Sequence, residues 1–404
     1  MSSEKKTILV LGGSFGGLSA THYTLKQILP SLPTDTYRIV IVNPSTHFWW
    51  RMAGPRVVAV NDLLPRETTF FPILDSFKAY PAGSVELIVG KATAWDADGR
   101  SVTVKLLEDG KDADREIVYD SLIIATGWSA ASPLFNHEGD KSVLQARQTE
   151  FVKTLSGAKT IVIGGGGPVA VETAGEIGEA LNGTAGWFGT RPAVQKARIT
   201  VVTRGKKLLP VLGQKQSTGA EHYLNRVGVD VAYNSLIERV EQVGEGKGGY
   251  AIHLSNGEVL TADIYLDATT VIPNSDYIPD RFKDEKGYVK TDHKSHQVDG
   301  AGERVYVVGD AGSFTRGGVM DMNNALPIAM ANLKSDLLKA NGKPEGNRAE
   351  WVRLDPMTQV VPVGRRRGVG AINGWNAPWV MVWLAKGRDY LLSMSAGVLY
   401  GKNW

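Results

Sequence analysis

The chain has 404 residues, a formal net charge of +3 and no cysteine. Its length allows two or three domains with substantial cores. The basic residues are spread along the chain and do not form the concentrated patch of a nucleic-acid-binding protein, so no nucleic-acid partner is expected. The lack of cysteine excludes structural disulfides, thiolate metal sites, cysteine nucleophiles and any redox-active dithiol.

The N-terminal sequence predicts a protein that is neither secreted nor lipid-anchored. Its first residues, MSSEKKTILV, contain no apolar signal core, and Ser2 in place of glycine excludes N-myristoylation. No apolar run approaches the length of about 18 residues that a spanning helix needs. We therefore expect a cytoplasmic protein, with peripheral contact at a membrane left open.

The first 43 residues predict the opening of a dinucleotide-binding fold. A strand over residues 8–11 ends in glycines, a helix-compatible segment covers 18–28, and YRIVIVN at 37–43 reads as the next strand. The following segments, VELIVGKATAW, SVTVKLL and EIVYDSLIIATG, are typical of an antiparallel meander.

The same plan then repeats. TIVIGGGG is a strand and a turn, 169–181 a helix, ARITVVT a strand, and a second meander ends in ADIYLDATT as the first ends in YDSLIIATG. One glycine motif is a weak signal, but two complete copies predict an α/β protein with two Rossmann-type dinucleotide-binding domains. The first closing segment contributes Ala125, Thr126 and Gly127 to the predicted cofactor site.

The glycine loop of the first module departs from the usual fingerprint. Gly12, Ser14 and Gly17 stand at its three glycine positions, with Gly16 beside them. The first glycine permits the tight turn and the last permits close helix–strand packing, while the pyrophosphate lies on the helix N-terminus. The Cβ of Ser14 would crowd the phosphate, although its hydroxyl could donate to it. Asn43 stands where an acid usually binds the ribose hydroxyls; a glycine turn with packing duty alone is the alternative for this loop.

The second loop can be aligned with the fingerprint in two ways. We prefer the alignment of Gly165, Gly167 and Ala170, because it places Pro168 at the first helical position, where its missing N–H costs nothing. Arg204 ends the next strand, where an NAD-type site would show an acid. With Lys206 or Lys207 it could hold a 2′-phosphate and favour NADPH; a solvated basic turn is the other interpretation.

A further strand, in RVYVVGDAGSF, ends in Gly309 and Asp310. The glycine would let the chain approach a cofactor, and the carboxylate would accept a hydrogen bond from a sugar or ribityl hydroxyl. An aspartate in this place can also be a helix cap.

The order of GGSFGG, ATG, GGGGPVAVE, ATTVIPN and VYVVGD resembles that of the two-dinucleotide-domain flavoproteins related to glutathione reductase. The tail GVGAINGWNAPWVMVWLAKGRDYLLSMS and the segment HFWWRMAGPR look like those of the ferroptosis-suppressor group, also called apoptosis-inducing-factor-2-like oxidoreductases, most like its fungal members. This resemblance implies a glutathione-reductase-like fold, with FAD on the first loop and NADPH or NADH on the second.

The resemblance also implies a division of the chain. The FAD-binding domain would comprise 1–150 and 268–335, the NAD(P)H-binding domain 151–267, and a C-terminal segment 336–404 would contact the flavin edge, a dimer partner or a membrane. Without cysteine, reduced flavin must pass electrons directly to an external acceptor, and the family implies a quinone. The protein would be a monomer or a homodimer.

Two alternatives to this quinone reductase stay open. One is a redox enzyme of secondary metabolism that acts on a specialised aromatic or quinoid substrate. The other is a slow-turnover flavoprotein whose cofactor state controls binding to a partner.

The resemblance suggests roles for further residues. Glu172 would reach toward the nicotinamide and flavin and orient a ring or relay a proton, although an acid early in a helix is also favoured by the helix dipole. Lys386 would stabilise anionic reduced flavin, unless it is a snorkelling surface lysine. Arg56 would lie near the cofactor, or form a surface ion pair. Pro327 would open a helix whose N-terminus faces the flavin pyrimidine ring.

The tail also contains tryptophans at a spacing of four. Trp375, Trp379 and Trp383 share one face if their segment is helical. That face could be a core stripe, a dimer contact or an interfacial surface feeding a lipid quinone, and the neighbouring arginines at 365–367 would suit anionic lipid heads or simply be solvated.

A pair of histidines is the nearest approach to a metal-binding pattern. His293 and His296 have a suitable spacing in DHKSH, but no third ligand lies nearby in the sequence. No metal site is therefore predicted.

Overall fold

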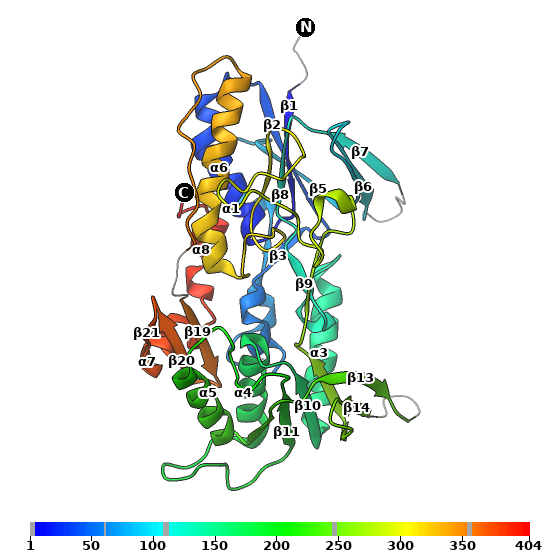
Figure 1. Ribbon diagram of the computed structural model, residues 1–404, viewed down its shortest axis with the longest axis vertical. Coiled ribbons are helices and arrows are strands. Elements are labelled where there is room, and N and C mark those ends of the chain that lie inside the picture. The colour runs from blue at the N-terminus through cyan, green and yellow to red at the C-terminus, as the bar shows by residue number, and fades with distance from the viewer. Residues whose placement is uncertain (1–4, 60–61, 108–112, 245–248, 354–357) are drawn as a thin grey trace.

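The computed structural model describes residues 5–59, 62–107, 113–244, 249–353 and 358–404, so Ser2 lies outside the described part. Two sheet-containing halves follow one another along the long axis, and the C-terminal segment runs back from the second half to the first (Figure 1). Within the described ranges, no helix is both long enough and apolar enough to cross a bilayer.

The first half is built on a seven-stranded sheet in the order β18-β8-β1-β2-β5-β6-β7. Its five strands from β18 to β5 are parallel, whereas β6 and β7 extend β5 as an antiparallel meander. The strands are β1 (Lys6–Leu11), β2 (Tyr37–Asn43), β5 (Val85–Asp96), β6 (Ser101–Leu106), β7 (Asp114–Val118), β8 (Ser121–Ile124) and β18 (Val305–Val307).

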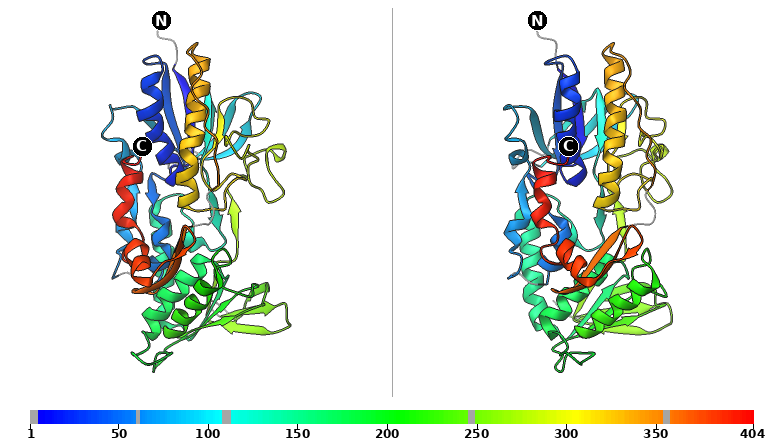
Figure 2. Two further views of the ribbon diagram at one scale, coloured as in Figure 1. Left: turned by 60° about the vertical axis from the view of Figure 1, so that its left-hand side comes forward. Right: turned by 90° about the vertical axis from the view of Figure 1, so that its left-hand side faces the viewer.

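Two helices, α1 (Phe15–Tyr23) and α6 (Val319–Ala340), lie side by side against this sheet (Figure 2). Their apolar side chains share one core cluster with those of β1 and β2. A parallel sheet needs such cover because its strands are apolar on both faces.

The second half repeats the parallel plan with a four-stranded sheet in the order β12-β11-β10-β16. A small antiparallel sheet, β13-β14-β15, adjoins it. The elements are α3 (Lys141–Gly157), β10 (Thr160–Gly164), α4 (Pro168–Asn182), β11 (Arg198–Val202), α5 (Gln214–Arg226), β12 (Val229–Ala232), β13 (Ile237–Gln242), β14 (Tyr250–Leu254), β15 (Val259–Ala262) and β16 (Ile264–Asp267).

Short two-stranded pairings complete these halves. One of these pairings joins the two halves: the strand after the Ala-Thr motif at 125–126 pairs with the strand after the Ala-Thr motif at 268–269. The strands are β3 (His47–Trp49) with β4 (Phe70–Pro72), and β9 (Trp128–Ala130) with β17 (Val271–Pro273).

The C-terminal segment packs on both halves. Its hairpin is β19 (Gln359–Val363), β20 (Arg367–Ile372) and β21 (Trp375–Asn376), followed by α7 (Trp379–Val382), the π-helical turn η8 (Trp383–Gly387) and α8 (Ser395–Leu399). The hairpin lies so close to α4 that a Cβ on Gly175 would be 2.7 Å from the Gly364 nitrogen. Helix α8 lies against α1 (Figure 2).

The local predictions held best for the parallel units. The strand at 37–43 has the predicted bounds, and the helix predicted at 169–181 is α4 with one further residue at each end. The meander segments were partly wrong, because EIVYDSLIIATG divides into antiparallel β7 and parallel β8, and the second meander likewise gives up β12 and β16 to the parallel sheet.

Two of the expected domain boundaries fall inside helices. A cut after residue 150 would divide α3, and a cut after 335 would divide α6. Leu144 and Leu155 of α3 belong to the same core cluster as Ile161 of β10, which associates this helix with the second sheet. The boundary at 267 coincides with the end of β16.

The tryptophan spacing does not describe one helical face. Trp375 lies in a strand, while Trp379 begins α7 and Trp383 begins η8. Trp375 is 81% exposed and Trp379 39% exposed, so the expectation of a core stripe is wrong for both. The turn at Gly374, which has a φ of +79°, reverses the chain so that Trp375 pairs with Ile372 of β20, and helical structure starts only at Trp379.

A buried histidine connects α1 to the C-terminal segment. His22 is fully buried; its Nδ1 is 2.8 Å from the Tyr80 hydroxyl and its Nε2 is 3.0 Å from the Leu399 carbonyl oxygen. Burial lowers the pKa of His22 from 6.5 to about 4. The folded protein therefore binds this proton less readily than the unfolded chain does.

We expect acid to weaken the protein through this group. The contribution of neutral His22 is complete above pH 6.5 and is lost as the pH falls toward 4, with a loss of at most about 3 kcal/mol. Urea unfolding at pH 7 and pH 5 would measure it, with His22→Gln as the control that shows a smaller pH dependence. His137 and His296 have pKa values lowered to about 4 by burial and keep part of the dependence in that variant. Equal pH dependence in the two proteins would contradict the assignment.

Candidate functional site

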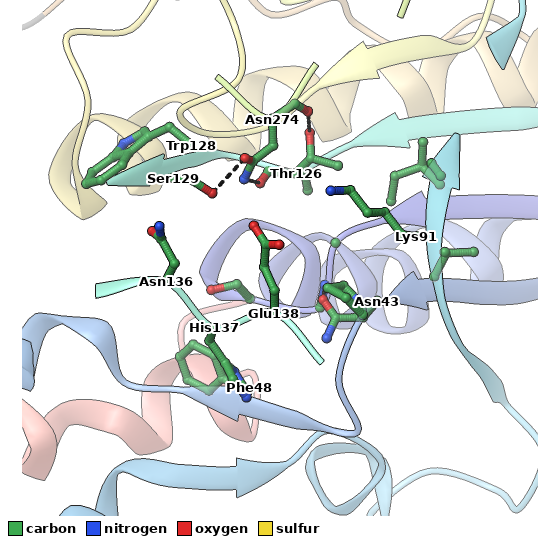
Figure 3. Close-up of a pocket in the computed structure, with 18 of the residues that line it drawn as sticks. Asn43, Phe48, Lys91, Thr126, Trp128, Ser129, Asn136, His137, Glu138 and Asn274 are labelled. Atoms are coloured by element: carbon green, nitrogen blue, oxygen red, sulfur yellow. Dashed lines mark hydrogen bonds between the residues drawn. The ribbon is translucent and has the colours of Figure 1, made fainter. Parts of the chain in front are cut away.

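The carboxyl ends of parallel strands β1, β2 and β8 surround a cavity in the first half, as expected for ligand sites in open α/β sheets. Five predicted cofactor-binding residues line it: Gly12, Ser14, Asn43, Ala125 and Thr126. Figure 3 shows this cavity with Asn43 and Thr126 on its walls.

The first loop can be built only with glycine at two of its positions. Gly12 has a φ of +106°, and a Cβ there would be 2.4 Å from the Ala125 carbonyl oxygen. A Cβ on Gly17 would be 1.7 Å from the Gly12 carbonyl oxygen. Gly16 is less restricted, since a Cβ would meet Val308 at 3.2 Å. These close approaches fit a cradle for a bound pyrophosphate.

Helix α1 begins at the edge of this cavity. Ser14 is its N-cap, and the Ser14 side chain makes no capping hydrogen bond. The first N–H groups of a helix attract anions, so the residues present fit the pyrophosphate of FAD.

Asn43 holds the loop from the end of β2. Its Oδ1 accepts a hydrogen bond from the Gly13 backbone N–H at 2.8 Å, and its Nδ2 donates to the Ser45 carbonyl at 2.7 Å. An acid at this position could accept the first bond but not donate the second. The predicted ribose contact of Asn43 stays a prediction.

Several residues that line the cavity were not predicted. Lys91 and Glu138 point into it, and Asn274 bonds Thr126 through the Thr126 hydroxyl and carbonyl (Figure 3). Lys91 could have been found, because β5 runs parallel to β2 as far as Val89 and the site follows such strand ends. Glu138 lies in a loop and carries no comparable sequence signal.

The carboxylate that follows β18 forms hydrogen bonds with other residues of the protein. Gly309 has a φ of +83°. Asp310 accepts hydrogen bonds from the Gly318 N–H at 3.0 Å and from Trp128 Nε1 at 2.8 Å, and burial raises its pKa. Gly318 is the N-cap residue of α6, so the carboxylate caps that helix, and neither Gly309 nor Asp310 lines the cavity. The predicted contact with a ribityl hydroxyl stays a prediction.

Pro327 does not open a helix. Helix α6 begins at Val319, and Pro327 lies in its interior. A proline there removes one hydrogen bond of the helix, but the apolar side chains of α6 are packed in a core cluster on either side of it, including Leu326 and Ala329. The N-terminus of the helix that contains Pro327 is therefore at Gly318, the N-cap of α6.

The second glycine loop copies the first at atomic level. Gly165 has a φ of +118°, and a Cβ there would be 2.4 Å from the Ala268 carbonyl oxygen. This is the same distance as from a Cβ on Gly12 to the Ala125 carbonyl oxygen. Gly167 is the N-cap of α4, and Ala170 is fully buried in its first turn. The two Ala-Thr segments thus close against the two loops, and Gly127 ends the first of them with a φ of +63°.

Basic residues follow the end of β11. Arg204 and Lys206 are exposed, whereas Lys207 Nζ donates to the Leu212 carbonyl at 2.5 Å. Lys206 and Lys207 were the two lysines expected to assist Arg204 in holding a 2′-phosphate. Of the two, Lys206 has the exposed side chain.

Helix α4 contributes the acid of a buried ion pair. Glu172 is 2% exposed, and its Oε1 lies 2.5 Å from Nζ of Lys386, which comes from η8. Burial raises the pKa of Glu172, and the nearby Lys386 ammonium opposes that rise. Lys386 is thus an internal ion-pair partner and not a surface lysine.

Arg56 is also internal, so its interpretation as a surface ion pair is wrong. It is 2% exposed in α2 (Gly54–Val57), and its Nη2 lies 2.7 Å from Glu176 Oε1. Glu176 also accepts a hydrogen bond from the Tyr390 hydroxyl at 3.1 Å. Sequence analysis missed Glu176 and Tyr390, although each follows a predicted catalytic residue by four positions, the spacing at which helical side chains meet.

Within the described residues, the two histidines do not belong to a cluster of metal-binding side chains. His296 is buried and stacks on Phe314 with ring centroids 4.0 Å apart. Across the described stretches of the chain, the structure shows no group of three metal-binding side chains.

Two Rossmann-type modules, each with a glycine loop at the carboxyl end of its first strand, define a two-dinucleotide-domain oxidoreductase. The family model described as pyridine nucleotide-disulphide oxidoreductase matches residues 6–329. The chain belongs to this family, with FAD and a nicotinamide dinucleotide as its cofactors.

Relatives extend over nearly the whole chain. Oxidoreductase phnG of Penicillium herquei is 39% identical over 413 residues, covering 100% of this chain and 98% of that protein. Oxidoreductase ptaL of Pestalotiopsis fici is 33% identical, covering 76% of each. Ferroptosis suppressor protein 1 of Taeniopygia guttata is 23% identical and covers 96% of this chain and 94% of that protein. With the apoptosis-inducing factor homologues, these relatives confirm the predicted group.

Solved structures confirm the fold. NDH2 from Plasmodium falciparum, in complex with NADH, superposes with a TM-score of 0.67 at 13% identity and covers 99% of this chain and 98% of that chain. The water-forming NADH oxidase from Lactobacillus brevis, bound to NADH, gives 0.65 at 14% identity and covers 91% and 75%.

Proposed function

We propose that this flavin oxidoreductase takes hydride from NAD(P)H and passes the electrons to a quinone-like acceptor without a redox disulfide. The observation that carries the proposal is the buried Glu172–Lys386 pair at the start of α4, in a chain with no cysteine. When bound, FAD supplies the chemistry, since it accepts a hydride and releases two electrons.

The residues of the chain have distinct tasks in this proposal. The first loop holds the FAD pyrophosphate, and the N-terminus of α4 holds that of the nicotinamide cofactor. Lys386 places a cation where negative charge develops during electron transfer. Glu172 keeps that cation in place, and its raised pKa suits a group that releases and takes up a proton.

An exposed apolar surface next to Lys386 supports peripheral contact with a membrane that contains the acceptor. We call it the tail patch: Trp375, Trp379, Val380, Met381 and Leu384, all exposed. Arg366 and Arg367 are exposed beside it, and Arg367 stacks on Trp379 at 3.9 Å. Tryptophan and arginine in such a surface suit an interface with anionic lipid. The competing proposal is that two copies of the chain form a homodimer through the tail patch. Without that contact the protein would be a monomer.

A second candidate function is a redox step on one specialised aromatic or quinoid substrate. Similarity to two fungal oxidoreductases, phnG over the full chain and ptaL over 76% of it, favours this candidate. It uses the same two cofactor modules and differs only in the acceptor.

One anaerobic experiment separates these functions. The purified yellow protein is titrated with NADPH and NADH in parallel, and the reduced protein is then mixed with a panel of simple quinones. We expect reduction at low NADPH, with NADH needed at higher concentration if Arg204 holds the 2′-phosphate, and fast reoxidation by several quinones.

Each other outcome points elsewhere. Equal reduction by both coenzymes would remove only the NADPH preference. Poor turnover of every simple quinone would favour the specialised substrate. A long-lived complex of reduced flavin and nicotinamide would favour redox-controlled partner binding instead. A flavin that neither coenzyme reduces would contradict the proposed function.

A further inference from the structure

A second buried ion pair lies one helical turn beyond the Glu172–Lys386 pair. Arg56 donates from Nε and Nη2 to Glu176 Oε1, at 3.1 and 2.7 Å, and the Tyr390 hydroxyl donates to the same oxygen. All three side chains are almost fully buried. They come from three parts of the chain: α2 of the first half, α4 of the second half, and the C-terminal segment.

The two pairs are connected through Tyr390. The Tyr390 N–H donates to the Lys386 carbonyl at 2.7 Å, which fixes the two residues one turn apart. The Tyr390 ring has Arg56 Cζ 4.7 Å and Lys386 Nζ 5.6 Å from its centroid, within the range of cation–π attraction. Burial raises the pKa of Tyr390 well above its ordinary value, so the hydroxyl stays a donor.

The backbone beyond Lys386 is strained and is held by the same neighbours. Tyr390 and Leu391 have φ values of +52° and +64°, in the left-handed region that disfavours side chains. Trp50 Nε1 donates to the Tyr390 carbonyl at 2.9 Å, and Arg56 Nη1 donates to the Arg388 carbonyl at 3.0 Å. A strained turn persists only when its surroundings determine it, and here they are residues of the first half.

We propose that Glu176, Arg56 and Tyr390 are positioning residues that hold Lys386 against Glu172 and set the charge around that carboxylate. The inference rests on the proposed function, because it gives the Glu172–Lys386 pair a part in electron transfer. It adds that this pair forms only when both halves and the C-terminal segment are assembled.

The charges around Glu172 predict shifts of opposite direction. It faces Lys386 from η8, Arg56 from α2, and Glu176 and Tyr390, while Glu179 on the next turn accepts from the Arg365 N–H of the hairpin. Removing the Glu176 charge favours ionised Glu172 and lowers its pKa. Removing the Arg56 charge has the reverse effect and raises its pKa.

The test follows flavin reduction by NADPH and reoxidation by menadione separately, from acid to alkaline pH, in the flavin-loaded protein. We expect the acid limb of the rate profile to move to lower pH in Glu176→Gln and to higher pH in Arg56→Met. Arg56→Lys is the matched control and should return the limb toward the wild-type pH, because it keeps the charge. Tyr390→Phe, which keeps every charge, should lower the rate about tenfold through one lost hydrogen bond to a charged group.

Limbs that stay in place, or that move the same way in both charge variants, would overturn the proposal, since general loosening cannot produce opposite shifts. If Glu176→Gln or Arg56→Met fails to fold, Tyr390→Phe still decides it, because an unchanged rate in that variant would also overturn the proposal. A wild-type protein that menadione does not reoxidise would contradict the proposed function alone, since the limb is then read from the reductive step.

Discussion

Replacing Glu172 by Gln is expected to slow turnover about hundredfold, or roughly 2.7 kcal/mol in the transition state. The amide keeps the shape of the side chain but leaves Lys386, which lies 2.5 Å away and is largely buried, without a counterion. An uncompensated buried charge takes up a new position or loses its proton. Stopped-flow rates with NADPH and with a quinone would show which step is slowed.

Lys386→Met is the reciprocal variant. It leaves Glu172 buried without its cation, which raises the pKa of the carboxyl further. Both variants should remain yellow, because neither residue lines the cavity of the first half. The double variant should lose little more than either single one, as expected for two groups that act as a unit. Full activity of Glu172→Gln, or fully additive losses, would contradict a shared role.

A matched pair of glycine variants is expected to separate the two cofactors. Gly12→Ala and Gly165→Ala introduce the same defect, since each Cβ would be 2.4 Å from a carbonyl oxygen of an Ala-Thr segment. Each also forces alanine into a φ above +100°. The strain costs about 1–3 kcal/mol, equivalent to roughly five- to 150-fold in affinity.

Gly12→Ala should be purified with little or no flavin, whereas Gly165→Ala should be yellow and require far more NADPH for reduction. Visible absorbance after purification and an anaerobic titration measure the two effects. Thermal unfolding provides the control, because a folding defect would lower the flavin content of both proteins. If Gly165→Ala were the colourless one, the assignment of FAD and nicotinamide to the two loops would be reversed.

The two glycine-loop modules show how much of the fold could be predicted from the sequence alone. The repeat of strand, glycine loop, helix and strand is local, and each copy is specified by neighbouring residues. The parallel pairing of β1 with β2 and of β10 with β11 therefore followed from the pattern. The meanders were less predictable, because whether β8 or β16 joins a parallel sheet depends on partners far along the chain.

The helical period of the tryptophans and the start of α6 were predicted less well than the parallel strands. The spacing of Trp375, Trp379 and Trp383 fits a helix, but the hairpin of β20 and β21 takes Trp375 out of that period. Pro327 was expected to open a helix, yet packing on both sides of it keeps α6 continuous. In both cases tertiary contacts overrode a local preference.

By itself the sequence determined the α/β class, the two glycine loops, the need for an electron acceptor other than a disulfide, and the residue types available for chemistry. Only the tertiary structure decided which of those residues meet. Lys386 reaches Glu172 across 214 positions and Arg56 reaches Glu176 across 120. Such contacts leave no periodic trace, because a buried charge needs a partner but does not specify where in the chain that partner lies.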